Sequence, residues 1–244
     1  MGRHGTIAGR KSAQDSKRAA LFTKYARLVT VAAKAGGDPD YNPGLRQAID
    51  KAKGIGMPND NITRAIKKGT GELGGESYEE MTFEGYGAGG VAVVVECLSD
   101  NKNRVAASVK HDFDKFGGNL GVPGCVSYMF TKKGVVEIEK TDGLTEDDVM
   151  MVALDAGADD VIVYDDSFEV QCEPAVLPDV DKALRDAGYE VVESDVDQVP
   201  TITSTPTDAA AIKSLKKMIE SLEDNDDVQK VYTNCTVDLY EDEE

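Results

Sequence analysis

Residues 42–71 read NPGLRQAIDKAKGIGMPNDNITRAIKKGTG, a pattern that predicts two short helices joined by a tight turn. Pro43 and Pro58 stand at positions where a helix can begin, because the first helical residue needs no backbone N–H donor. Gly54 and Gly69 stand where a chain commonly leaves a helix in the left-handed conformation. The segment is therefore expected to form a compact helical hairpin.

Both predicted helices are amphipathic. The apolar positions that share a face are Leu45, Ala48, Ile49 and Ala52 in the first helix, and Ile62, Ala65 and Ile66 in the second. Opposite the second apolar face, Arg64, Lys67 and Lys68 are expected to point outward together. A helical surface that is basic in a strongly acidic chain requires a reason, and nucleic-acid binding supplies one.

Charge is divided unevenly along the chain, which has a formal net charge of −18 at pH 7. The residues up to Tyr78 carry 14 Lys and Arg against 7 Asp and Glu, a net charge of +7, and the remainder carries −25. Such asymmetry suggests one end that binds nucleic acid and one that phosphate repels. The plainer interpretation, an acidic surface that favours solubility, accounts for the acidic part but less well for the basic one.

Two further basic segments precede the helical pair. The first, residues 1–13, lacks apolar periodicity and is expected to be an arm that either follows a phosphate backbone or is simply a disordered terminus. The second, residues 15–35, predicts one long helix with a wide apolar stripe, which completes a three-helix module. The candidate nucleic-acid-binding residues of this module are Arg3, Arg10, Lys11, Lys17, Lys24, Arg27, Lys34, Arg46, Lys53, Arg64, Lys67 and Lys68.

Sheet structure is expected beyond the Gly- and Glu-rich linker at residues 71–80, because the apolar period changes there from 3.6 to 2. The first elements are a strand at 91–97, a helix at 102–116 and a strand at 125–131. The G-x-G-x-x-G pattern at 85–90 precedes its strand, whereas a dinucleotide site needs it after one. We therefore interpret it as a turn.

Residues 134–204 predict strand, helix, two strands, helix and strand, which is the order of a ferredoxin-like unit. This part holds 20 Asp and Glu against 3 Lys and Arg, so no nucleic-acid contact is expected on it. A connector at 199–206, a helix with Thr205 as its cap and Pro206 in its first position, and a strand at 228–238 follow. The last helix and strand can complete the earlier sheet.

The predicted fold is therefore α+β, with an N-terminal three-helix module and two α/β-sandwich domains, one of them ferredoxin-like and inserted in the other. The expected domains are a basic helical domain at 1–78, a discontinuous middle domain at 79–133 plus 205–244, and an acidic ferredoxin-like domain at 134–204.

Catalysis finds little support in the sequence. His4 lies in the arm and His111 is expected on the polar side of its helix. The four cysteines are widely spaced, without a C-x-x-C pair or a Cys–His cluster, and are expected to be buried thiols in a reducing cytosol. No apolar stretch approaches the roughly 18 residues of a membrane span. We expect a cytoplasmic, non-enzymatic protein with no cofactor, metal, small-molecule substrate or membrane partner.

Three blocks of this sequence resemble the YebC/PmpR family. They are GGDPDYNPGLRQAIDKAKGIGMPNDNITRAIKKGTGELGG, YEEMTFEGYGAGGVAVVVECLSDNKNR and GGNLGVPGCVSYMF. The family includes proteins labelled transcriptional regulators and the mitochondrial translational activator of cytochrome c oxidase. The resemblance covers essentially the whole chain and implies three domains and a cytoplasmic, non-enzymatic role in gene expression. The family's usual tryptophan in the arm is missing here, which removes a stacking role but not the charge.

Three functions are compatible with these observations. A DNA-binding transcriptional regulator would use Lys and Arg for phosphate contacts, although the sequence shows no clear recognition helix for base edges. A ribosome- or rRNA-associated translation factor would need only phosphate contacts and shape. An enzyme would need a metal held by carboxylates, and dependence on magnesium would reveal it. The sequence favours the regulator, leaves DNA against RNA open, and is compatible with a monomer.

Overall fold

The computed structural model describes residues 18–74 and 77–240 of the 244-residue chain. The chain forms two compact units. Among the described residues, one unit contains residues 18–126 together with Pro206–Val231, and the other contains Ser127–Thr205 together with residues 232–240. The finer division into three domains, with boundaries near residues 78, 134 and 204, stays a prediction.

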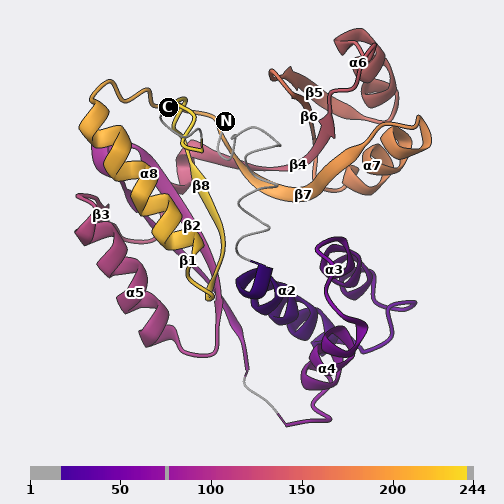
Figure 1. Ribbon diagram of the computed structural model, residues 1–244, viewed down its shortest axis with the longest axis horizontal. Coiled ribbons are helices and arrows are strands. Elements are labelled where there is room, and N and C mark those ends of the chain that lie inside the picture. Colours follow the sequence, from indigo (N-terminus) through magenta and orange to yellow (C-terminus); the bar gives the residue numbers. More distant parts are fainter. Residues whose placement is uncertain (1–17, 75–76, 241–244) are drawn as a thin grey trace. The chain divides into compact units, whose positions relative to one another are not determined.

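The helical module forms as the apolar periodicity predicts (Figure 1). Helix α2 (Arg18–Ala32) runs into the 3₁₀ turn η1 (Ala33–Ala35), and helices α3 (Pro43–Gly54) and α4 (Asn59–Gly69) follow. Asn42 caps α3, since its side-chain oxygen accepts a hydrogen bond of 3.0 Å from the Leu45 amide. The buried core of the module is Val29, Ala33, Leu45, Ala48, Ile49, Ala52, Met57, Ile62 and Ala65.

The glycines of the module act differently from the prediction. Gly54 and Gly69 are the last residues of their helices, and the left-handed conformation falls instead on Gly56 (φ +76°) and Gly71 (φ +84°). Gly69 is needed for packing, because a Cβ there would lie 2.2 Å from the Thr30 carbonyl oxygen in α2. Pro58 is the residue before α4 rather than its first residue.

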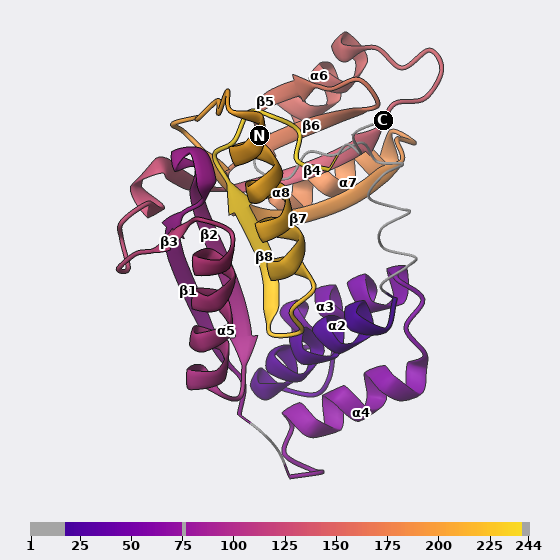
Figure 2. The same ribbon diagram turned by 60° about the vertical axis from the view of Figure 1, so that its left-hand side comes forward.

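The first sheet has the strand order β3-β1-β2-β8. Its strands are β1 (Glu79–Tyr86), β2 (Ala92–Ser99), β3 (Asn119–Leu120) and β8 (Val228–Thr233). Helices α5 (Lys102–Lys115) and α8 (Ala209–Glu223) contact each other and cover one face of this sheet (Figure 2). Because β8 and α8 lie far along the chain from β2, this arrangement confirms that the last helix and strand complete the earlier sheet.

The glycine-rich stretch at residues 85–90 joins two antiparallel strands, β1 and β2, through the 3₁₀ turn η2 (Ala88–Gly90). It does not lead from a strand into a helix, so the interpretation as a turn is confirmed and the dinucleotide fingerprint is absent here. The sequence did not predict strand β1 itself. His111 is exposed on α5, as expected.

The second sheet has the order β5-β6-β4-β7 and is antiparallel throughout. Its elements in chain order are β4 (Phe130–Glu139), α6 (Glu146–Asp155), β5 (Ala158–Val163), β6 (Ser167–Cys172), α7 (Leu177–Asp186) and β7 (Val191–Pro200). This order and pairing confirm the ferredoxin-like unit. Its core includes Val136, Ile138, Phe168 and Val170 from the strands and Val149, Val180 and Leu184 from the helices.

Several expected boundaries in these sheets are wrong. The strand expected at 228–238 ends at Thr233. Residues 127–129 form a 3₁₀ turn, so the strand expected at 125–131 begins only at Phe130 and continues to Glu139. Strand β7 extends to Pro200, because residues expected in a connector pair with β4 as far as Phe130. Helix α8 begins at Ala209, with Asp208 rather than Thr205 as its cap.

Candidate nucleic-acid interface

The twelve predicted nucleic-acid-binding residues fall into three groups: those outside the described residues and, among the described residues, those bonded within the chain and those exposed without a partner. Four of them, Arg3, Arg10, Lys11 and Lys17, lie outside the described residues. Five are engaged within the chain, and these are Lys24, Arg27, Lys34, Arg46 and Lys68. The remaining three, Lys53, Arg64 and Lys67, are exposed, and in the described part of the chain their side chains have no hydrogen-bonding or ionic partner.

Helix α4 presents two of the three cations without a partner. Its buried residues Ile62 and Ala65 fix which side faces the module core, so Arg64 and Lys67 must point away from it. Lys53 is exposed in the last turn of α3, at the neighbouring end of the connection between the two helices. Among the candidates within the described residues, these three are the ones available for phosphate oxygens.

The cations of helix α2 serve the fold instead. Arg27 forms an ion pair of 2.7 Å with Asp227 Oδ1 and also donates to the Asp226 carbonyl. Lys24 donates to the carbonyl of Glu223, and Lys34 donates to the carbonyl of Tyr78 over 2.9 Å. The helical periodicity predicted that these basic residues would form a solvated face. In the structure, Lys24, Arg27 and Lys34 instead bond α2 to later segments of the chain.

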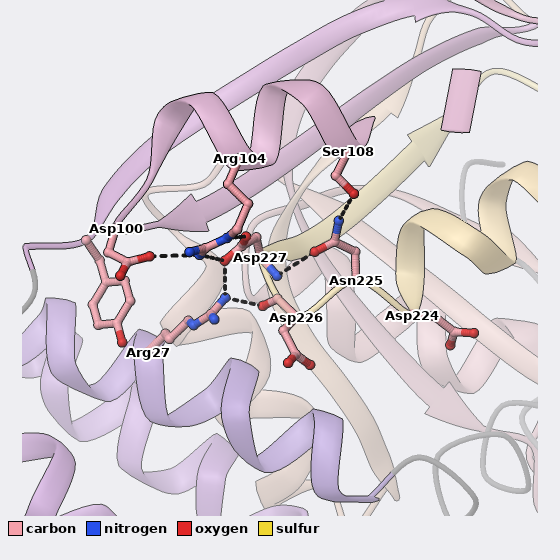
Figure 3. Close-up of a pocket in the computed structure, with 9 residues that line it drawn as sticks. Arg27, Asp100, Arg104, Ser108, Asp224, Asn225, Asp226 and Asp227 are labelled. Carbon is pink, nitrogen blue, oxygen red and sulfur yellow. Dashed lines mark hydrogen bonds and ion pairs between the residues drawn. The ribbon is translucent and has the colours of Figure 1, made fainter. Parts of the chain in front are cut away.

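Asp227 is the centre of these links (Figure 3). Its side chain is 7% exposed and faces two guanidinium groups, that of Arg27 at 2.7 Å and that of Arg104 at 3.0 and 3.1 Å. Arg104 also pairs with Asp100 at 2.8 Å, and the Asp227 amide donates to the Asn225 side chain. The Asp227 carboxylate is therefore a shared hydrogen-bond acceptor for two charged donors from different helices.

A pocket of about 520 Å³ surrounds this network. It is lined by Arg27, Tyr78, Asp100, Arg104, Ser108 and the loop residues Asp224, Asn225, Asp226 and Asp227. Figure 3 shows the two arginines converging on Asp227 from α2 and α5. With the arginines already paired and four carboxylates in its lining, the pocket does not resemble an anion site.

Tyr78 is a second gathering point for the module's cations. The Arg27 guanidinium lies 5.6 Å and the Lys68 ammonium 5.8 Å from the centre of its ring. Because Lys34 also donates a hydrogen bond to the Tyr78 carbonyl, three predicted nucleic-acid contacts meet at this one residue of the linker. Arg46, the fifth engaged cation, pairs at 2.7 Å with Asp40 on the surface.

The network perturbs the ionisation of groups around it. The Arg104 guanidinium holds the pKa of Asp100 below its usual value through a direct hydrogen bond. Burial, followed by the negative charge of Asp227, raises the pKa of the Cys97 thiol to about 12. Sequence reasoning missed Asp227, Arg104 and Tyr78, because nothing in their spacing shows that they meet α2.

No group of three His, Cys, Asp or Glu within residues 18–74 and 77–240 is arranged to hold a metal ion. In the same ranges, none of the helices combines the length and the apolar character of a membrane span. The cysteines of these ranges are free thiols, of which Cys97, Cys172 and Cys235 are buried and Cys125 is partly buried.

Two family models match almost the entire chain. The model described as the TACO1/YebC protein N-terminal domain matches residues 3–72, and that of the TACO1/YebC second and third domain matches residues 78–235. The chain belongs to the TACO1/YebC family. The resemblance seen in the sequence is thereby confirmed, and the helical module coincides with the family's N-terminal domain.

Relatives in this family match over their whole length. A probable transcriptional regulatory protein of Clostridioides difficile is 50% identical over 98% of this chain and 100% of its own. One of Listeria monocytogenes is 49% identical over 95% of this chain and 96% of its own. The crystal structure of a conserved hypothetical protein from Aquifex aeolicus superposes with a TM-score of 0.83 at 40% identity, covering 91% of each chain.

Proposed function

We propose that this protein is a cytoplasmic, non-catalytic transcriptional regulator that binds duplex DNA through its helical module. The observation that carries the proposal is the pair Arg64 and Lys67 on the exposed side of α4, with Lys53 nearby in sequence on α3. In a chain of net charge −18, exposed cations without ionic partners among the described residues can contact the phosphate oxygens of a nucleic acid.

The names of the relatives support the regulatory part of the proposal. Proteins about half identical over their full length are named as probable transcriptional regulatory proteins. The acidic ferredoxin-like unit supports the assignment of binding to the helical module. Its carboxylates repel phosphate, whereas the module carries exposed cations that attract phosphate. Lys53, Arg64 and Lys67 then contact phosphate oxygens and set the salt dependence of binding.

The test is a salt series of binding to duplex DNA, to structured RNA and to purified ribosomes, with the full chain. We expect duplex DNA to bind most tightly. The double variant Arg64→Ala/Lys67→Ala should weaken that binding and flatten its slope against log salt concentration by about 1.8, or about 0.9 for each lost phosphate contact.

A matched control removes two exposed lysines from another helix. Lys110→Ala/Lys115→Ala in α5 changes the net charge by the same amount and should leave the slope unchanged. Equal effects of the two double variants would show that net charge, and not this surface, governs binding. Retention on ribosomes alone would reassign the protein to translation, and absence of binding to all three would overturn the proposal.

A further inference from the structure

Helices α3 and α4 form a helix-turn-helix. Four residues, Ile55 to Pro58, connect the two helices, and Gly56 takes the left-handed conformation at φ +76°. Met57 then inserts into the module core at 4% exposure, and its amide bonds the Ala52 carbonyl at 3.0 Å. A short turn with one glycine and one buried apolar residue fixes the second helix against the first.

Helix α2 completes the arrangement, because it packs against both α3 and α4. The close approach at Gly69 holds α4 directly on the α2 backbone near Thr30. A helix supported on one side by α2 and α3 can present its other side as a rigid surface, which sequence-specific contacts require.

The exposed side of α4 carries a particular set of side chains. Five exposed residues spread over about 140° of the helix at 100° per residue, and these are Asn59, Asp60, Thr63, Arg64 and Lys67. Within the described part of the chain their side chains make no hydrogen bond or ion pair. The buried Ile62 and Ala65 occupy the opposite side.

The chemistry of this set matches base edges better than a uniform basic surface does. Asn bonds adenine, Asp accepts from cytosine, and Thr contacts several bases, whereas Arg64 and Lys67 suit phosphates. At 1.5 Å per residue, α4 is about 16 Å long, and the major groove of B-form DNA admits a helix of this kind.

We propose that α4 is a recognition helix that enters the major groove of duplex DNA, with Asn59 and Thr63 at base edges and Arg64 and Lys67 at phosphates. This inference rests on the proposed function and adds sequence selectivity to it. It also assigns a recognition helix, which the sequence did not reveal, and the burial of Ile62 and Ala65 fixes the side of α4 that this assignment uses.

The experiment selects binding sites for the full chain from a library of random duplex DNA and then measures affinities for the enriched site and its single-base variants. Asn59→Ala should reduce the discrimination at one or two adjacent base pairs by about tenfold and leave the salt slope unchanged. Asn61→Ala is the matched control, because Asn61 lies in the same turn but is partly buried on another side of α4. Thermal melting of both variants confirms that they fold.

The outcomes separate this inference from the proposed function. If the full chain binds duplex DNA with a steep salt dependence but enriches no motif, or if Asn59→Ala retains the full base preference, α4 is not a recognition helix and the proposed function stands. A parallel selection from a library of structured RNA that enriches a motif, where the DNA library enriches none, also overturns the inference, because the major groove of A-form RNA is too narrow for a helix. Absence of any nucleic-acid binding overturns both.

Discussion

Helices α2 and α4 both carry several basic side chains, yet the tertiary structure uses them in opposite ways. In α2, Lys24, Arg27 and Lys34 bond later parts of the chain. In α4, Arg64 and Lys67 are exposed and have no ionic partner among the described residues. The difference arises because α2 faces carbonyls and the carboxylate of Asp227, whereas no residue of the described ranges bonds Arg64 or Lys67 on the outer side of α4. Basic residues at helical spacing therefore form a binding surface only where no carboxylate or carbonyl from another segment bonds them.

The largest expected change in stability comes from removing the Asp227 carboxylate, which pairs with Arg27 of α2. Asp227→Ala leaves Arg27, whose side chain is only 13% exposed, without its carboxylate partner, and leaves Arg104 paired with Asp100 alone. We expect the free energy of unfolding to fall by about 3 kcal/mol, as for other buried pairs that lose one partner. Urea unfolding of the full chain measures it. Asp226→Ala is the control, because only the backbone carbonyl of Asp226 bonds Arg27 and its exposed side chain contributes within about 0.5 kcal/mol.

The packing between α2 and α4 gives the second effect. Gly69→Ala places a methyl group against the Thr30 carbonyl and the Ala33 side chain, so we expect a loss of about 2 kcal/mol from overpacking. Gly54→Ala is the matched control, since that position ends α3 in open space. The control should be neutral or more stable, and equal losses in both variants would show that the contact with α2 is unimportant.

Replacing one cation in each helix compares their roles in stability and in DNA binding directly. Arg27→Gln should lower the free energy of unfolding by about 1–2 kcal/mol through lost charged hydrogen bonds and leave the salt slope of DNA binding unchanged. Lys67→Gln should change the free energy of unfolding by no more than about 0.5 kcal/mol and lower the salt slope of DNA binding by about 0.9. Binding titrations and urea unfolding of both variants provide the four values. If Arg27→Gln lowered the salt slope of DNA binding, Arg27 in α2 would be a phosphate contact.

The smallest effect concerns Cys97, which reports on the same network. Its folded pKa is raised to about 12, first by burial and then by the charge of Asp227. Folding therefore favours the neutral thiol, and this contribution is fully present below the ordinary thiol pKa near 9 and is lost as the pH rises above it. Between pH 9 and pH 10 the protein should lose about 1 kcal/mol that Cys97→Ala does not lose. Urea unfolding at the two pH values measures the difference.

Native-state thiol labelling is an independent check on this environment. Cys97 should react with a neutral thiol reagent at pH 8 far more slowly than the same residue in urea, because a buried neutral thiol is a poor nucleophile. Asp227→Asn removes the second cause of the raised pKa and should speed the reaction. An unchanged rate in that variant would place Asp227 outside the electrostatic surroundings of Cys97.

The sequence determined the elements and much of their order. Apolar positions at a period of 3.6 defined the three helices around Leu45 and Ile62, and the strand–helix order of residues 134–204 defined the ferredoxin-like unit. These features depend on local periodicity, which a single sequence contains. Boundaries such as Phe130 and Ala209 were missed because strand pairing and helix caps depend on partners elsewhere in the chain.

Only the tertiary structure decided which charges face outward. Lys24 and Arg27 in α2 satisfy the same helical pattern as Arg64 and Lys67 in α4, and nothing in the spacing of residues 24 to 67 distinguishes them. The distinction comes from Asp227, which is 200 residues from Arg27 along the chain and 2.7 Å from it in space. A long-range ion pair depends on where the backbone places both partners, so periodicity predicts the helix and its two sides but not what will contact them.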